Sequence, residues 1–430
     1  MTQSENPPAI PASEWRADLV VIVVLAAFIV LSRLPYIVPF ESMGRDGPLY
    51  VHSLKLDSTY DVPMPGNIGF VVAARLVQSL FPDPVMAYGG LNIALAVAGV
   101  SATYLVGRFW LPRPVAAAAA FALATNTVVW WHGGAISSYL VWLATLPLLG
   151  YFGLRFVRDR RCADALAASV VLGVGSIFRQ DMLMFGGPLW LGCLLLGRAR
   201  LRLLLAGGLI VAACCAVWLG AMSTIFGGLD IYLTRVRAKH DWHVENFSFQ
   251  AKGLFEGLTR NGVKYLFFLV WSAGLVVVPA ALGIVARLGH PLRRWRPILL
   301  GLLWVAPSLW FSFFIFTGNA GLIFPALPLV YLGAADGLRL VFRDRSDTRA
   351  SIALVLLALA STVQFTASPL PRETDQRQAI LNVTFFKYSG TGLRAFYNYG
   401  LLDFDIDTSL KTVVAQMRHP QPVPKMPAGR

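Results

Sequence analysis

The sequence predicts an all-α polytopic membrane protein with about eleven transmembrane helices, on the rule of roughly 20 apolar residues per span. Hydrophobic residues make up 56% of the 430 residues and charged residues only 14%, whereas soluble domains carry about 25% charged residues. Apolar runs such as LVVIVVLAAFIVL, AAAAAFALA and ALVLLALA recur from end to end. Short arginine clusters separate the runs, which is typical of a chain that crosses a membrane repeatedly.

The arginine clusters fall at alternate junctions between the apolar runs. They lie around residues 108–113, 155–161, 198–202, 287–296 and 339–349. The junctions WWHGGAISS, FRQDM and FTGNAG are nearly free of basic residues. Because positive charge stays on the cytoplasmic side, this alternation predicts a cytoplasmic N-terminus and a C-terminus outside. The net charge of +14 therefore reports topology, and no nucleic-acid partner is expected.

The predicted domain organisation follows from the side of the membrane assigned to each junction. A cytoplasmic tail over residues 1–18 precedes a membrane domain over 19–368, and an outer-face tail or small cap covers 369–430. Within the membrane domain, the first outer loop spans residues 41–84 and a second large outer loop spans 227–262. Since all three substantial polar pieces share the outer face, we expect the chemistry there.

The first apolar run predicts a retained helix, because further spans follow it and it lacks a small-residue cleavage site. In the first outer loop, residues 68–81 read IGFVVAARLVQSLF, with apolar residues at helical spacing. This segment is too short to span a bilayer and predicts an interfacial helix along the membrane surface. The cysteines Cys162, Cys193, Cys214 and Cys215 lie in or beside apolar runs and are interpreted as buried free thiols.

The first outer loop carries a recognisable order of features. RDGPLY contains Arg45 and Asp46, a spacer containing Asp57 and Asp61 follows, and PMPG ends at Gly66 before the short amphipathic segment. This order resembles the C-type (GT-C) integral membrane glycosyltransferases, and among them the protein O-mannosyltransferase-like bacterial proteins. In that family a catalytic acidic residue follows the first span, and surface helices come next.

The resemblance is clearest over about residues 31–110, where the segment YGGLNIALAVAGVSATYLVGRFW also resembles the span that follows in the family. One departure is the missing histidine of the family's His-Pro-Pro-Gly, where this chain has Val62 or Pro63. Any role of that histidine is therefore not expected here.

The resemblance implies transfer of a sugar from a polyprenyl-phosphate-linked donor to a glycan, protein or lipid acceptor, outside a bacterial inner membrane. An acceptor hydroxyl is a weak nucleophile, so a carboxylate must take its proton as the bond forms. Asp46 is the predicted base and Asp57 the second candidate. The family implies inversion, a single displacement that needs one base. Asp-Gly-Pro is also a good turn former, so a turn role for Asp46 stays open.

The leaving lipid phosphate calls for cations on the outer face. Arg45 lies beside the predicted base, and Arg179 lies at an outer junction with Asp181 two residues on. Arg179 could bind phosphate or simply pair with Asp181. In the second loop, YLTRVRAKHDWHVEN offers Arg235, Arg237, Lys239 and His240, which could bind phosphate or lipid headgroups or form a solvated face.

The histidines of the chain are candidate sugar contacts or metal ligands. His132, in WWHGG, could contact the sugar with Trp130 and Trp131, although these tryptophans also fit an aromatic belt at a membrane interface. His240 and His243 form an H-x-x-H pair with no third ligand at motif spacing, so no metal site is predicted. A divalent cation stays open as a cofactor.

Two other functions remain as alternatives: a lipid or solute transporter or flippase, and a non-catalytic subunit of envelope assembly. Transporters usually keep ionisable residues or broken helices at the bilayer midplane, often in paired repeats. Here the apolar runs are nearly free of charge and no internal repeat is evident. The acidic first outer loop favours an enzyme over both alternatives.

Overall fold

A computed structural model describes most of the membrane domain. The described residues are 12–34, 37, 46–55, 66–288, 291–317, 320–342 and 347–367. They are almost entirely helical, which confirms the predicted all-α class. The predicted tail over 369–430, together with Arg45, Asp57 and Asp61, lies outside them.

The helices are numbered in the order in which they follow one another along the chain. In the first half they are α1 (Ala12–Arg33), α2 (Asp46–Lys55), α3 (Ile68–Gln78), α4 (Pro84–Gly107), α5 (Arg113–Ala124), α6 (Thr127–Gly134), α7 (Leu140–Asp159), α8 (Cys162–Phe178) and α9 (Met182–Leu196). In the second half they are α10 (Leu201–Phe226), α11 (Leu229–Phe247), α12 (Phe249–Lys252), α13 (Leu254–Ala273), α14 (Val277–Leu288), α15 (Pro291–Trp310), α16 (Leu327–Val341) and α17 (Asp347–Ala367). Short 3-10 and π turns join some of them, such as η3 (Phe311–Ile315) after α15.

Several of these helices are long and apolar enough to cross a membrane. Among the described residues there are six such helical segments, or seven if α5 and α6 form one span bent by 59°. The helices α3, α8 and α9 are apolar but shorter. The chain is therefore a polytopic membrane protein, and the predicted number of about eleven spans stays a prediction.

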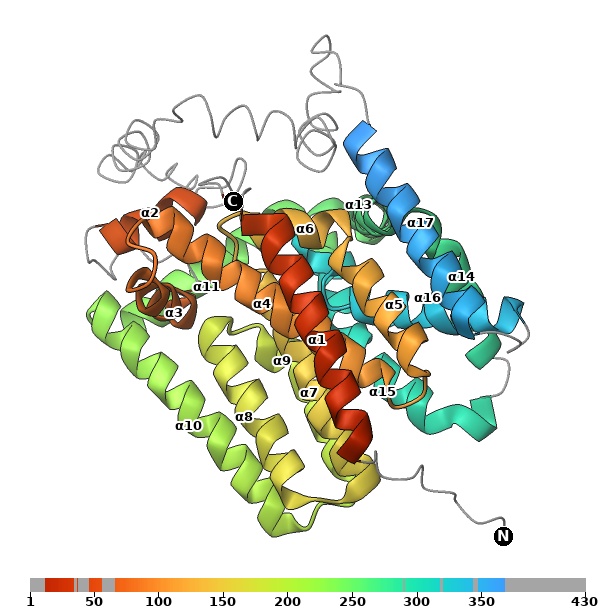
Figure 1. The fold of residues 1–430 in the computed structure, drawn as a ribbon. Coiled ribbons are helices and arrows are strands. Elements are labelled where there is room, and N and C mark those ends of the chain that lie inside the picture. Colours follow the sequence, from red (N-terminus) through yellow and green to blue (C-terminus); the bar gives the residue numbers. More distant parts are fainter. Residues whose placement is uncertain are drawn as a thin grey trace.

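The elements predicted for the outer face lie together. Figure 1 shows α2, α3, α6 and α11 at one end of the bundle, where α1 ends, whereas the α7–α8 and α9–α10 turns lie at the opposite end. Those opposite turns carry the arginine clusters of residues 155–161 and 198–202. Charge and architecture thus distinguish the same two ends, called here the outer end and the arginine-rich end.

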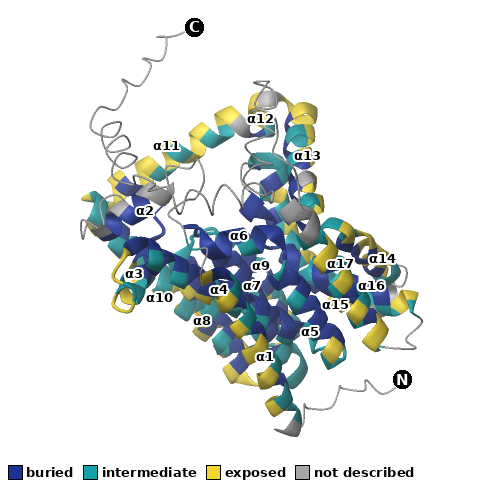
Figure 2. Ribbon diagram, turned by 45° about the horizontal axis from the view of Figure 1, so that its top comes forward, coloured by how far each residue is buried: buried dark blue, intermediate teal, exposed yellow. Residues whose placement is uncertain are grey.

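Both predicted outer loops contain helices. The interfacial segment forms α3, which ends three residues earlier than the predicted boundary at Phe81. The stretch around Asp46 was expected to be a loop or turn, yet it begins α2, where an aspartate favours the positive end of a helix. The second loop forms α11, which is exposed along most of its length in Figure 2.

Glycines allow the closest helix crossings. A Cβ atom added to Gly337 of α16 would lie 2.0 Å from the carbonyl oxygen of Pro279 on α14, and one added to Gly283 would lie 2.1 Å from that of Gly333. Gly333 and Gly337 are four residues apart, the small-xxx-small spacing that brings membrane helices together. Close backbone contact therefore holds α14 against α16.

The crossing of α4 and α7 has the same character. A Cβ atom on Gly99 would lie 2.5 Å from the carbonyl oxygen of Leu143. Pro147 lies inside α7 and has no N–H to donate to that carbonyl, four residues earlier. Gly99 thus covers a carbonyl group that the helix itself leaves without a partner.

The surface of the bundle fits a lipid environment. Large apolar residues are exposed along α1 and α10, among them Val20, Val24, Leu205 and Leu209. The cysteines are free in the structure, but only Cys193 is buried. Cys214 and Cys215 are partly buried, and the expectation of burial is wrong for Cys162, which is exposed at the start of α8.

Candidate active site

A network of polar side chains lies at the outer end, where α2, the turn before α3, the α6–α7 connection and the α8–α9 junction meet. We call it the outer polar cluster and define it by Tyr50, Asn67, Ser138, Arg179 and Asp181. Tyr50, Asn67 and Ser138 are buried, and the side chain of Arg179 is only 13% exposed. Four separate parts of the sequence converge here.

Hydrogen bonds run through this cluster from α2 to the α8–α9 junction. The amide nitrogen of Asn67 donates to the hydroxyl of Tyr50 (2.6 Å) and to Oγ of Ser138 (3.2 Å). Nη1 of Arg179 donates to the same Oγ at 2.8 Å. Since buried polar groups are costly unless paired, this network fixes α2 relative to the bundle.

Arg179 is held on both its edge and its faces. Its Nη2 and Nε donate to the two carboxylate oxygens of Asp181 at 2.8 and 3.2 Å, and the indole N–H of Trp142 donates to Oδ1 at 2.8 Å. The guanidinium also lies over the rings of Trp142 (4.1 Å to the centroid) and Tyr139 (4.6 Å). Burial disfavours its charged form, but the charge and hydrogen bonds of Asp181 outweigh burial and raise the pKa of Arg179 above its usual value.

The local sequence explains why these two side chains meet. Helix α8 ends at Phe178, and Arg179 takes an extended conformation with φ of −148°. Asp181 then precedes α9, and its carboxylate makes no capping hydrogen bond to that helix. The carboxylate is therefore available to Arg179 and Trp142.

The predicted base lies next to this cluster along the chain. Asp46 is the first residue of α2, one helical turn before Tyr50. Helix α2 is fixed by aromatic packing, since the ring of Tyr50 lies 5.2 Å from that of Phe70 and 5.5 Å from that of Tyr88. The carbonyl of Ser53 also accepts a hydrogen bond from Arg75 at 3.0 Å. These contacts hold the middle and second half of α2, and Asp46 lies one turn before them.

His132 lies deeper in the fold. It is fully buried on α6, with Nδ1 2.8 Å from Oγ of Ser137 and its ring 5.8 Å from that of Tyr139. Its predicted contact with the sugar stays a prediction. Trp131 is only 3% exposed and packs in the core, so the alternative of an aromatic belt is wrong for this residue.

The cations of the second loop lie along α11. Arg235, Arg237 and His240 are exposed, and the ion pair of Arg237 with Asp241 is long at 3.9 Å. Lys239 is half-buried, and its carbonyl oxygen lies 2.8 Å from Nδ1 of His243. These basic side chains lie along an exposed helix at the outer end, and their role as phosphate or headgroup ligands stays a prediction.

No metal site is evident in the described part of the chain, where no three His, Cys, Asp or Glu side chains come together to hold an ion. His240 and His243 have no third ligand among these residues.

Sequence reasoning missed several members of this region, including Tyr50, Asn67, Ser138 and Trp142. It also missed Arg33, which is fully buried at the end of α1. Nη2 of Arg33 donates to the carbonyl of Ala124 at the carboxyl end of α5 (2.6 Å). The one available signal was the run of small polar residues in AISSYLVW beside the tryptophan-rich junction.

Comparison with known structures identifies the fold. No protein-family model and no curated protein matches the chain. Among solved structures, the crystal structure of ArnT from Cupriavidus metallidurans bound to undecaprenyl phosphate superposes with a TM-score of 0.60 at 16% identity, covering 94% of this chain and 74% of that one. The chain has the GT-C fold.

A second GT-C structure agrees more loosely. The oligosaccharyltransferase of Archaeoglobus fulgidus, in a complex with zinc and sulfate, gives a TM-score of 0.50 at 14% identity. The alignment covers 84% of this chain but 56% of the archaeal one. The GT-C fold confirms what the first outer loop predicted, whereas the narrower resemblance to the protein O-mannosyltransferase-like proteins stays a prediction.

Proposed function

We propose that this protein is a membrane glycosyltransferase that moves a sugar from a polyprenyl-phosphate-linked donor to an acceptor on its outer face. The observation that carries the proposal is the likeness over 94% of the chain to ArnT, whose structure holds undecaprenyl phosphate. The outer polar cluster, beside the acidic first outer loop, supports the location of the reaction. A bacterial inner membrane is the expected setting.

In this proposal the carboxylate of Asp46 takes the proton of the acceptor hydroxyl as its oxygen attacks the anomeric carbon. The bond from that carbon to the phosphate oxygen breaks, and the lipid phosphate leaves with the electron pair. One displacement inverts the anomeric configuration. The platform of Tyr50, Phe70 and Tyr88 supports this by holding α2 in a fixed orientation, because a displaced base loses much of its effect.

The growing negative charge of the leaving phosphate needs nearby cations. Arg179 uses three of its five N–H groups within the outer polar cluster, so two remain for an anion. Asp181 already neutralises it in part. The exposed Arg235 and Arg237 of α11 keep more of their hydrogen-bonding capacity, and we assign them the first capture of the donor phosphate.

The test is sugar transfer by purified protein with radiolabelled polyprenyl-phosphate sugars and acceptors from membrane extract. Asp46→Asn should lower the rate by about 10²- to 10⁴-fold, the usual contribution of a general base. Glu245→Gln, a carboxylate-to-amide change at an exposed residue of α11, is the matched control and should retain transfer.

Other outcomes would redirect the assignment. Full activity of Asp46→Asn with loss in Asp57→Asn would move the base to the second candidate. An α-linked product from a β-linked donor would support inversion, and a retained configuration would contradict it. No transfer with any donor would favour a transporter, a flippase or a non-catalytic assembly subunit.

A further inference from the structure

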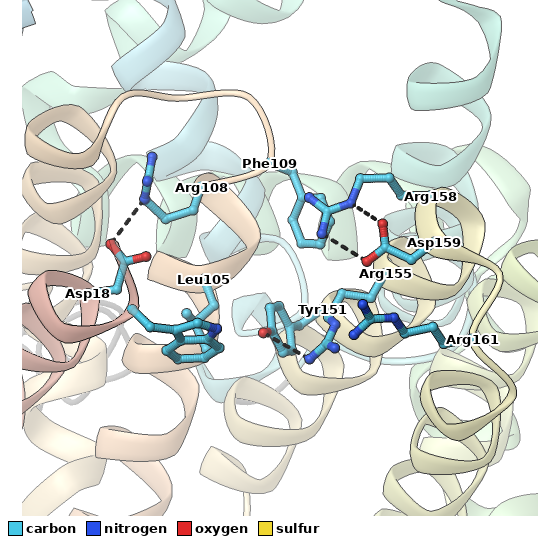
Figure 3. Close-up of a pocket in the computed structure, with 10 residues that line it drawn as sticks. Asp18, Leu105, Arg108, Phe109, Tyr151, Arg155, Arg158, Asp159 and Arg161 are labelled. Atoms are coloured by element: carbon cyan, nitrogen blue, oxygen red, sulfur yellow. Dashed lines mark hydrogen bonds and ion pairs between the residues drawn. The ribbon is translucent and has the colours of Figure 1, made fainter. Parts of the chain in front are cut away.

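A pocket lies at the arginine-rich end, on the opposite side of the bundle from the outer polar cluster. It is formed by the ends of α1, α4 and α7 and by the α7–α8 turn. Its lining residues are Trp15, Asp18, Leu105, Arg108, Phe109, Tyr151, Arg155, Arg158, Asp159 and Arg161, and we call it the arginine pocket. Figure 3 shows Arg155 and Arg161 extending toward its middle from the α7–α8 side.

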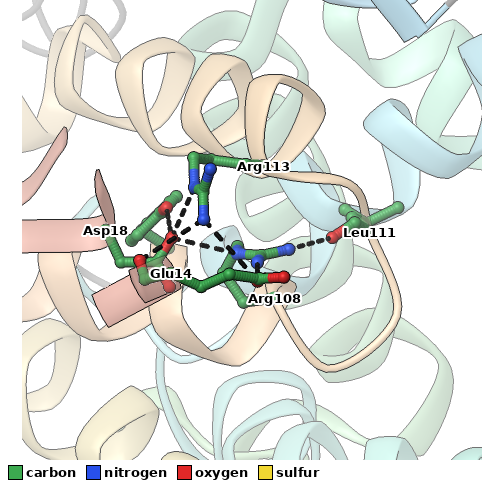
Figure 4. Close-up of polar contacts among 6 residues, drawn as sticks. Glu14, Asp18, Arg108, Leu111 and Arg113 are labelled. Carbon is green, nitrogen blue, oxygen red and sulfur yellow. Dashed lines mark hydrogen bonds and ion pairs between the residues drawn. The ribbon is translucent and has the colours of Figure 1, made fainter. Parts of the chain in front are cut away.

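On the α1 side, the charges of the pocket are already balanced. The carboxylate of Asp18 accepts hydrogen bonds from Arg108 (3.2 Å), Arg113 (2.9 Å) and the hydroxyl of Tyr104. Arg108 also donates to Glu14 (2.8 Å) and to the carbonyl of Leu111 (3.2 Å), as Figure 4 shows. Three N–H groups of Arg108 therefore already have partners within the protein, and these bonds hold the α1 side of the pocket in place.

On the α7–α8 side, the arginines use only part of their hydrogen-bonding capacity within the protein. Nε and Nη2 of Arg158 bind Asp159 (2.6 and 3.0 Å), while Nε of Arg155 binds Asp164 (3.2 Å) and its Nη1 donates to Tyr151 (3.4 Å). Each of these guanidiniums has five N–H groups, so several remain. No described carboxylate forms an ion pair with Arg161, which is exposed.

Four arginines and two aspartates line the pocket, so its lining carries a net positive charge of two. The α7–α8 turn, which lies between Arg158 and Arg161, has an unusual backbone conformation. Arg160 ends α7 with φ of 57°, a left-handed conformation that usually selects glycine. Here that position is an arginine, next to Arg161 and two residues after Arg158.

The rest of the lining is apolar and lies beside the lipid-facing surface. Trp15 is 45% exposed on α1, where Leu19 and Val20 are 56% and 63% exposed. Phe109 packs under the guanidinium of Arg158, with 4.9 Å from its Cζ to the ring centroid. Arginines above an aromatic and apolar floor, at the end of a membrane bundle, match an anionic headgroup whose chains continue along the bundle.

We propose that the arginine pocket binds the phosphate of an anionic phospholipid, with Arg155, Arg158 and Arg161 as its ligands. Basic pockets between membrane helices at this level are suited to lipid headgroups. The same donors could bind a soluble phosphate compound, but the exposed Trp15 and its apolar neighbours favour the lipid. The site is independent of the proposed transferase activity and faces the opposite leaflet.

Native mass spectrometry of the full chain in detergent would test the site, with phosphatidylglycerol and phosphatidylcholine of identical acyl chains as probes. The wild type should bind phosphatidylglycerol more tightly, and Arg161→Gln should weaken that binding about 5-fold, the effect of one basic residue near a charged lipid. Arg160→Gln removes the same charge from a residue outside the lining and is the matched control. Thermal unfolding in phosphatidylcholine alone would verify that each variant is folded.

Three outcomes would overturn the proposal. Equal binding of the two lipids by the wild type would mean that the pocket does not select an anionic headgroup, whatever the variants do. Equal losses in Arg160→Gln and Arg161→Gln would show a general surface charge and no defined pocket. Displacement of phosphatidylglycerol by an equal concentration of inorganic phosphate would reassign the ligand to a soluble phosphate compound.

Discussion

Arg179 shows how much structure one charged residue can organise. It contacts four side chains at once, a carboxylate, a serine hydroxyl and two aromatic rings, through the charge, the N–H groups and the flat faces of its guanidinium. The paired carboxylate compensates for the loss of water around the charge. Arg179 therefore belongs to the framework of the site as much as to its substrate surface.

Replacement of Arg179 by lysine keeps the charge but loses the two-pronged hydrogen bond and the stacked plane. We expect Arg179→Lys to lower the free energy of unfolding by about 2 kcal/mol. Arg237→Lys, whose ion pair is long and 85% exposed on the arginine side, should cause little measurable change. Denaturation of both variants in detergent would compare them, and an equal loss would mean that the packing of Arg179 contributes nothing.

The sequence predicted part of this chemistry at the residue scale. Pairing of Arg179 with Asp181 was one of two interpretations, because the two residues are close in the sequence. Asn67 and Ser138 could not be paired in the same way, since 71 residues separate them. Only the packing of α3 on α4, and of α4 on α7, brings them together, and a single sequence carries no signal for that contact.

The crossing of α14 and α16 is the clearest case at the scale of the element. Gly337→Ala would place a methyl group on the backbone oxygen of Pro279, which cannot move aside as a flexible side chain could. We expect a loss of about 3 kcal/mol or a shift of the two helices. A Cβ atom at Gly220 on α10 meets nothing within 4 Å, so Gly220→Ala should be neutral or stabilising by up to about 1 kcal/mol.

Thermal unfolding in detergent would separate these two glycine variants. Equal stability of Gly337→Ala and the wild type would mean that the helices are not in backbone contact. At this scale the sequence predicted α3 and most long helices from apolar spacing. It did not predict α2, because Asp-Gly-Pro is compatible with both a turn and a helix start, and tertiary packing on Phe70 and Tyr88 selects the helix.

For the whole molecule, composition and charge pattern predicted the fold class and the separation of two ends. The orientation of those ends in the membrane can be tested with Cys162, which is exposed at the arginine-rich end, and His240, which is exposed at the outer end. The arginine-rich end is predicted to be cytoplasmic, so Cys162 should be inaccessible from outside the cell and His240 should be accessible.

Two single-cysteine chains would be compared, one with Cys162 alone and one with His240→Cys alone. In intact cells, a membrane-impermeant maleimide should label the His240→Cys chain and leave the Cys162 chain unlabelled. After permeabilisation both positions should react. The reverse pattern would contradict the orientation given by the positive-inside rule. It would also place the proposed donor site in the cytoplasm, where the proposed reaction at the outer face could not occur.

Helix α7 joins the two ends, since Trp142 binds Asp181 near its start and Arg158 lines the arginine pocket near its finish. A helix bends most easily where an internal hydrogen bond is missing, and Pro147 creates that point at the carbonyl of Leu143. Gly99 presses on the same carbonyl, so bend and support coincide. Helix α7 is therefore hinged where it crosses α4, so its two halves can tilt separately at the two membrane surfaces.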